Sequence, residues 1–81
     1  MNIFISNLCA DTKVTQLRNL FSRFGIVKHI MIIREGRAII PRVCGWVVMT
    51  DETEGLRAIQ NLDHSRFMQQ IILVNQATML A

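Results

Sequence analysis

Aromatic and basic side chains alternate with aliphatic ones in two short segments of the chain. Residues 42–49 read Arg-Val-Cys-Gly-Trp-Val-Val-Met, and residues 3–8 read Ile-Phe-Ile-Ser-Asn-Leu. Successive side chains of a strand point to opposite faces, so Arg42, Cys44 and Trp46 share one face of the first segment. In the second segment, Phe4 points to the face opposite to that of its aliphatic neighbours Ile3 and Ile5. Exposed rings beside a cation suit single-stranded nucleic acid, because bases stack on rings and phosphates are anionic.

Other side chains capable of chemistry are scattered along the chain. Cys9 and Cys44 fit neither the spacing of metal ligands nor a disulfide framework, and His29 and His64 stand too far apart to suggest a metal site. The six carboxylates have positions that suit a helix start or a loop, so they form no recognisable acid–base pair. We therefore expect no enzymatic activity, no metal and no cofactor.

Length and composition limit the class of protein. The 81 residues, of which 51% are hydrophobic and 19% charged, predict one folded domain over residues 1–81. Nine Lys and Arg against six Asp and Glu give a net charge of +3, which mildly favours anionic partners. Apolar runs fall short of the about 18 residues of a membrane helix, and the N-terminal residues lack the pattern of a signal peptide. Free thiols suit a reducing compartment, so we expect a cytoplasmic protein with no membrane contact.

Hydrophobic periodicity divides the chain into strands and helices. We expect strands at residues 2–6, 26–33, 43–49 and 70–76. A first helix should start at a cap formed by Asp11 or Thr12 and end at Gly25. Its apolar residues recur at the spacing of one helical face and are Leu17, Leu20, Phe21 and Phe24.

A second helix is expected at residues 51–62, capped by Thr50 or Asp51. Its predicted apolar positions are Leu56, Ala58, Ile59 and Leu62. Gly36 and Pro41 should bracket a loop between the second and third strands, since both residues interrupt regular structure.

The order strand–helix–strand–strand–helix–strand predicts an α+β fold. It is the split βαβ arrangement of ferredoxin-like folds, βαββαβ, in which two helices cover one face of a four-stranded antiparallel sheet. The other face stays open, and the two aromatic segments above supply side chains to it.

The chain resembles the RNA recognition motif family over about residues 2–77. The hexamer pattern of that family is met in full by residues 3–8. In its octamer pattern, Arg42, Gly45, Trp46 and Val47 match, whereas Cys44 stands in the place of an aromatic residue. Two further departures are Val43 for a glycine and Met49 for the last aromatic. The compact single-domain form resembles stand-alone bacterial members of the family.

The resemblance implies that bases stack on Phe4 and Trp46, that Arg42 pairs with a phosphate, and that Asn75 and Gln76 read base edges. The full set of RNA-binding residues it implies is Phe4, Ser6, Met31, Arg34, Arg37, Arg42, Cys44, Trp46, Asn75 and Gln76. The partner would be an unpaired stretch of RNA, bound without chemical change.

Two of these assignments have a simpler alternative, because Arg34 and Arg37 would also be ordinary solvated charges of a loop. The open face as a whole also has an alternative interpretation, since it is more apolar than RNA binding requires. The aliphatic residues expected on it are Met31, Ile33, Val48, Ile71 and Leu73. The same face could thus bind a protein, form a homodimer, or be covered by residues 78–81. We expect a monomer that binds RNA, because a self-complementary dimer would bury two copies of Arg42.

Overall fold

The computed structural model describes residues 1–37 and 40–77, without the side chains of residues 37, 40 and 41. The two helices and the four strands of the main sheet follow the expected order, and two further short strands lie before the last one. The elements are β1 Asn2–Ser6, α1 Val14–Ser22, β2 Val27–Arg37, β3 Ile40–Met49, α2 Glu52–Leu62, β4 Arg66–Phe67, β5 Gln70–Ile71 and β6 Leu73–Gln76.

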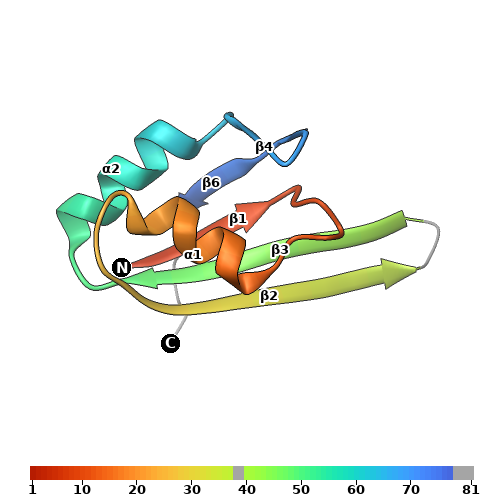
Figure 1. The fold of residues 1–81 in the computed structure, drawn as a ribbon, viewed down its shortest axis with the longest axis horizontal. Helices are drawn as coiled ribbons and strands as arrows, with labels where there is room; N and C mark the ends of the chain where they lie inside the picture. The colour runs from red at the N-terminus through yellow and green to blue at the C-terminus, as the bar shows by residue number, and fades with distance from the viewer. Residues whose placement is uncertain (38–39, 78–81) are drawn as a thin grey trace.

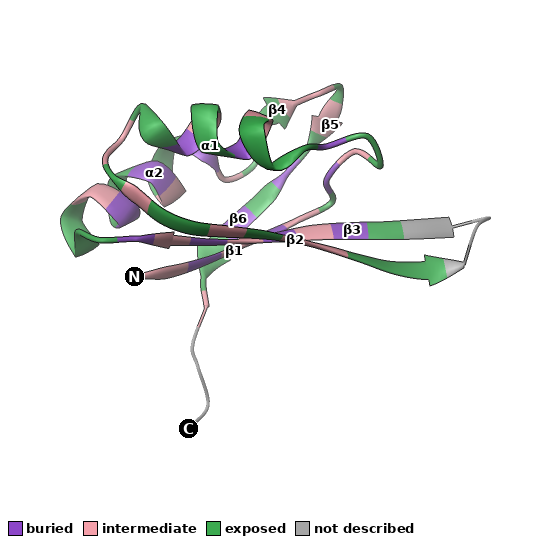
Figure 2. Ribbon diagram, turned by 60° about the horizontal axis from the view of Figure 1, so that its bottom comes forward, coloured by how far each residue is buried: buried purple, intermediate pink, exposed green. Residues whose placement is uncertain are grey.

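One sheet and two helices form the two layers of the molecule. Strands β2, β3, β1 and β6 lie side by side in that order, and each neighbouring pair is antiparallel. Both helices pack on one face of this sheet, as Figures 1 and 2 show from two directions. The structure therefore has the predicted α+β ferredoxin-like fold, βαββαβ, and one face of the sheet is left without a helix.

The core lies between the helices and the covered face of the sheet. Its buried members alternate along the strands and recur on one side of each helix; they are Ile3, Ile5, Leu8, Leu17, Phe21, Val43, Val47, Met49, Ala58, Leu62, Ile72 and Val74. Leu20, Phe24 and Ile59 pack against them, as predicted. Leu56 does not, because its side chain is 43% exposed. Gly55 is buried in its place, so the inner face of α2 begins one residue earlier than expected.

The start of α1 differs from the prediction of a cap at Asp11 or Thr12. The buried Thr12 hydroxyl donates instead to the carbonyl oxygen of Cys9, at 2.6 Å. The capping position is taken by Lys13, whose backbone N–H donates to Oε1 of Gln16 at 2.8 Å. A side chain from within the helix thus satisfies the N–H of the capping residue, which is one half of a capping box.

The other helix boundaries are closer to expectation. The Asp51 carboxylate accepts a hydrogen bond from the backbone N–H of Glu54 at 2.8 Å, which confirms the predicted cap of α2. Helix α1 ends at Ser22 rather than at Gly25. Gly25 follows the helix and is placed where Glu54 packs against its backbone, so a Cβ atom there would clash.

Strands β2 and β3 are longer than predicted, and the bounds expected for the loop between them, at Gly36 and Pro41, are wrong. These two residues face each other within the β2–β3 ladder. Gly36 has a φ of 97°, which suits glycine, so it continues the pairing where other residues would be strained. Strand β1 pairs with β3 only at Gly45–Val48. The backbone N–H of Leu8 also donates to the carbonyl oxygen of Val43, at 3.0 Å. At Pro41, β2 is the one strand among the described residues that pairs with β3, and a proline is tolerated on such an edge. The pair extends past the rest of the sheet (Figure 1).

The single strand expected at residues 70–76 is divided in two. Strand β5 pairs with β4, and β6 pairs with β1. The β4–β5 turn consists of Met68 and Gln69, with φ values of 51° and 71°. Two residues with positive φ are typical of a tight type I′ hairpin, usually made by Asn or Gly, so the sequence carries no signal for it. Ile71 therefore belongs to this small ribbon and not to the open face of the main sheet, which corrects its predicted position.

Candidate nucleic-acid interface

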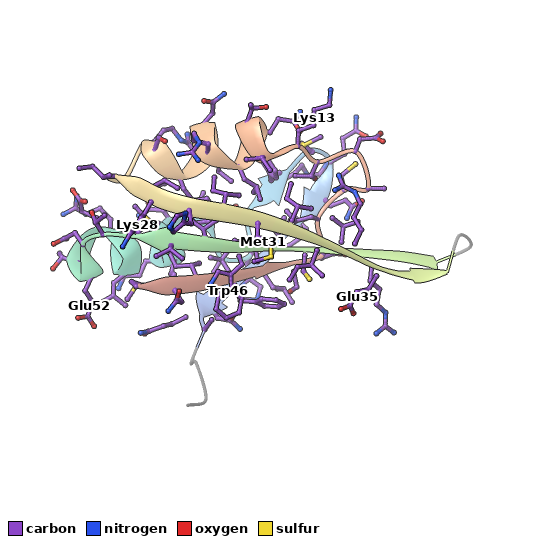
Figure 3. The ribbon with its side chains drawn as sticks, turned by 90° about the horizontal axis from the view of Figure 1, so that it is seen from below. Lys13, Lys28, Met31, Glu35, Trp46 and Glu52 are labelled. Carbon is purple, nitrogen blue, oxygen red and sulfur yellow. The ribbon has the colours of Figure 1, made fainter. Side chains whose placement is uncertain are left out.

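A row of four side chains crosses the open face of the sheet, one from each strand. Trp46 of β3 lies opposite Met31 of β2 and opposite Phe4 of β1. Phe4 in turn lies opposite Asn75 of β6. Since the alternate residues Ile3 and Val47 are buried under the helices, this row points the other way. Figure 3 shows Trp46 and Met31 on the sheet away from the helix that follows Lys13.

The two rings at the centre of the row are in contact. Their centroids are 6.3 Å apart and their planes meet at 74°, an edge-to-face arrangement. The indole N–H of Trp46 donates to Oδ1 of Asn2 at 3.2 Å, which fixes the orientation of the larger ring. Both rings are half-buried. Each ring presents apolar surface to solvent, and the two ring planes are steeply inclined to each other.

Cys44 and Ser6 extend the face toward the end of the sheet. Cys44 lies opposite Ile33, and its thiol donates to the carbonyl oxygen of that residue at 3.8 Å. Burial raises the pKa of the Cys44 thiol, and the negative charge of Glu35 raises it further. The group is therefore a neutral thiol at physiological pH and lacks the depressed pKa of a reactive cysteine.

Two residues of the matched motifs are explained by the fold rather than by a ligand. Asn7 has a φ of 63°, a conformation that Asn tolerates, and its side-chain amide donates to the carbonyl oxygen of Ile71 at 2.7 Å. It ends β1 and ties it to β5. Gly45 lies under α1, and a Cβ atom there would come within 3.0 Å of Cδ1 of Leu17 and 3.2 Å of Cδ1 of Leu8. Its lack of a side chain lets the helix approach the sheet.

The basic residues separate into different environments. Arg42 is exposed on the open face, opposite Glu35. Arg34 lies in β2 rather than in a loop, and its guanidinium donates to the carbonyl oxygen of Thr12 at 2.7 Å. This bond attaches the β2 strand to the segment before α1, so the structure does not bring Arg34 to the aromatic row. The backbone of Arg37 ends β2, and its side chain lies outside the description.

At the C-terminal strand the two predicted polar residues diverge. Asn75 is exposed in the row beside Phe4. Gln76 lies opposite Ile3, whose side chain is buried under the helices. The Gln76 side chain therefore leaves the strand on the face that carries the helices and not on the open face. Leu73 lies opposite Ser6 on the open face and is 43% exposed, as expected. The proposed cover by residues 78–81 falls outside the described residues.

Two residues of this surface were not among the predicted set. Glu35 lies beyond the strand expected at residues 26–33, and alternation with Met31 and Ile33 brings it to the open face because β2 continues to Arg37. Asn2 shares the face of Phe4 by alternation along β1, but its bond to Trp46 depends on strand register and cannot be inferred from the sequence.

The described residues contain no group of three or more His, Cys, Asp and Glu side chains arranged to hold a metal. Over the same part of the chain, none of the helices is long and apolar enough to cross a membrane.

Known proteins resemble this chain in both sequence and fold. The sequence profile described as RNA recognition motif matches residues 3–73. The chain belongs to the RNA recognition motif family. Its β1 hexamer and β3 octamer are thus the two ribonucleoprotein motifs of that family, with Cys44 as the main departure.

Relatives occur in long and short proteins. Human scaffold attachment factor B2 is 30% identical over 76 residues, which are 94% of this chain and 8% of that protein. The chain thus spans less than a tenth of the length of this relative. The bacterial putative RNA-binding protein RbpF of Nostoc sp. is 27% identical over 77 residues, covering 95% of this chain and 73% of the other. The crystal structure of the RNA binding protein PG1 aligns with a TM-score of 0.87 at 28% identity, covering 100% of this chain and 98% of PG1.

Proposed function

We propose that the protein binds single-stranded RNA on the open face of its sheet and acts by binding, without catalysis. The observation that carries this proposal is the row of Met31, Trp46, Phe4 and Asn75, which runs across all four strands on the face without helices. Membership of the RNA recognition motif family supports RNA as the nucleic acid. RNA in a duplex hides the faces of its bases, whereas unpaired RNA offers them for stacking.

The inclination of the two rings constrains how RNA lies on them. Since the ring planes meet at 74°, two bases stacked on Phe4 and Trp46 are steeply inclined to each other and cannot also stack together. Binding therefore breaks a base step within the strand. Flexible unpaired segments with weak internal stacking lose least by this, so we propose only a modest sequence preference from the rings.

The ends of the row and the charge beside it complete the binding surface. Met31 is 57% exposed, and its flexible thioether can pack against a third base or a ribose. The Asn75 amide offers both donors and an acceptor to a base edge. Arg42 supplies a cation for a phosphate. We expect about two to four nucleotides to lie across the row and to bind weakly.

A comparison of single-stranded RNA with a duplex of the same sequence tests this proposal. In a fluorescence polarisation titration, the unpaired strand should bind more tightly than the duplex, because its bases reach the rings. Equal or tighter binding of the duplex would contradict the stacking mechanism.

The oligomeric state separates the proposal from the alternative that the face forms a homodimer. We propose a monomer, because Arg42 and Asn75 interrupt the apolar residues of the face and a symmetric dimer would bury two copies of that arginine. Sedimentation at micromolar concentration should show a monomer. A dimer that Trp46→Ala dissociates, and that RNA does not disrupt, would favour a protein-interaction module. The cytoplasmic location stays a prediction from the sequence.

A further inference from the structure

A hollow of ≈ 370 Å³ lies on the open face beside the aromatic pair, toward the extended end of β2 and β3. Its walls are formed by Phe4, Ser6, Asn7, Glu35, Arg42, Val43 and Cys44. The family pattern has an aromatic residue in the place of Cys44, and a thiol fills much less of that space. Ligand pockets begin at about 300 Å³, so this volume suits a single small ring system such as a nucleobase.

One anionic and one cationic side chain line the hollow. Glu35 and Arg42 face each other across β2 and β3, and Figure 3 shows Glu35 projecting from the sheet. Among the described residues, the ion pairs within 4.0 Å do not include these two groups, so both have hydrogen-bonding capacity for a ligand. The carboxylate only accepts hydrogen bonds and the guanidinium only donates them.

The four bases differ in how well they match this pair. Guanine carries two adjacent donors, N1–H and N2–H, followed along the same edge by the acceptor O6. Adenine, cytosine and uracil each offer only one donor-bearing nitrogen on the corresponding edge. Both oxygens of a carboxylate are therefore satisfied at once by guanine, and a neighbouring guanidinium can reach its O6.

We propose that this hollow is a guanine-selective base pocket, in which Glu35 accepts from N1–H and N2–H while Arg42 donates to O6. The inference rests on the proposed binding of single-stranded RNA, to which it adds a sequence preference. Phe4 forms one wall against the base plane. Arg42 has five N–H donors, so one edge of its guanidinium can contact O6 while another contacts a phosphate.

Four short RNAs test the proposal: a uridine pentamer and its variants with guanosine, adenosine or cytidine at the central position. In fluorescence anisotropy titrations, the pentamer with a central guanosine should bind about tenfold more tightly than the other three RNAs, a difference that one good bidentate contact provides. Glu35→Gln should reduce this preference to less than about twofold, because an amide has one acceptor and one donor. Glu52→Gln is the matched control, since Glu52 is an exposed carboxylate in the first turn of α2; it should leave the preference intact.

A second variant tests the location through volume instead of charge. Cys44→Phe fills the hollow with a ring, so it should abolish the guanosine preference, measured as the ratio of the two Kd values for the guanosine-containing and the all-uridine pentamer. Wild-type protein that binds all four pentamers equally would overturn the guanine pocket and leave the proposed function standing. A preference for cytidine, or a guanosine preference that survives both Glu35→Gln and Cys44→Phe, would also overturn it. Failure to bind any pentamer would overturn both proposals.

Discussion

Replacing Trp46 by alanine should weaken the binding of single-stranded RNA by about 2 kcal/mol, or about thirtyfold in Kd. Stacking on an aromatic side chain contributes roughly 1–3 kcal/mol per base. The upper value requires a fully available ring, whereas Trp46 is half-buried and its edge-to-face contact with Phe4 already occupies part of the aromatic surface. The expected loss therefore lies in the middle of the range. It should be independent of salt, because the substitution removes no charge.

The assay is a polarisation titration of wild type and variants with one uridine-rich RNA at two salt concentrations. Trp46→Phe is the matched control, because it keeps a ring for stacking and loses only the indole N–H that donates to Asn2. It should bind within about threefold of wild type. Cooperative thermal melting of Trp46→Ala would show that it remains folded. A folded Trp46→Ala protein with unchanged affinity would refute the argument that bases stack on this face.

Three further outcomes are expected. Arg42→Ala should lower the slope of log Kd against log salt by about 0.7, the value for one lost phosphate contact on a single strand; an unchanged slope would exclude a phosphate role. Gly45→Ala should lower the unfolding free energy by about 1–3 kcal/mol in urea titrations, since its Cβ would press against the buried Leu17 at 3.0 Å; unchanged stability would show that α1 can shift. Burial, and secondly Glu35, raise the pKa of the Cys44 thiol, so the folded state holds this proton more tightly than the unfolded chain. Its contribution to stability should be complete below about pH 8.5 and fall as pH rises beyond that, a decline that Cys44→Ser should reduce in the same titrations. An identical pH profile for both proteins would contradict the raised pKa.

Much of the fold could be predicted from local pattern. The alternation of residues 2–6 and the helical spacing of Leu17 and Phe21 each identify a face that must be buried, and the structure buries those faces. The order of elements then allows few topologies. Errors arose where a residue type has two uses. Gly36 and Pro41 usually interrupt strands, but here Gly36 supplies a positive φ within the ladder, and Pro41, which lies opposite it, falls outside the part of β3 that pairs with β1.

The binding surface was predictable only in part. Phe4 and Trp46 follow from alternation, which the strand register confirms for their shared face. The position of Arg34 could not be foreseen, because its bond to the carbonyl oxygen of Thr12 joins segments 22 residues apart. The hollow at Cys44 also depends on Glu35 lying in a strand, which required the length of β2 to be known.

The central claim is that unpaired RNA binds to the open face of the sheet, and a heteronuclear NMR titration tests it most directly. Addition of a short uridine-rich RNA to ¹⁵N-labelled protein should shift the amides of Phe4 and Cys44, and above all the indole N–H resonance of Trp46, whose bond to Asn2 makes it sensitive to a base stacked on the ring. Amides on the outer surfaces of α1 and α2 should remain unshifted. Shifts confined to the helices, or an indole resonance that stays in place while RNA binds elsewhere, would contradict the account.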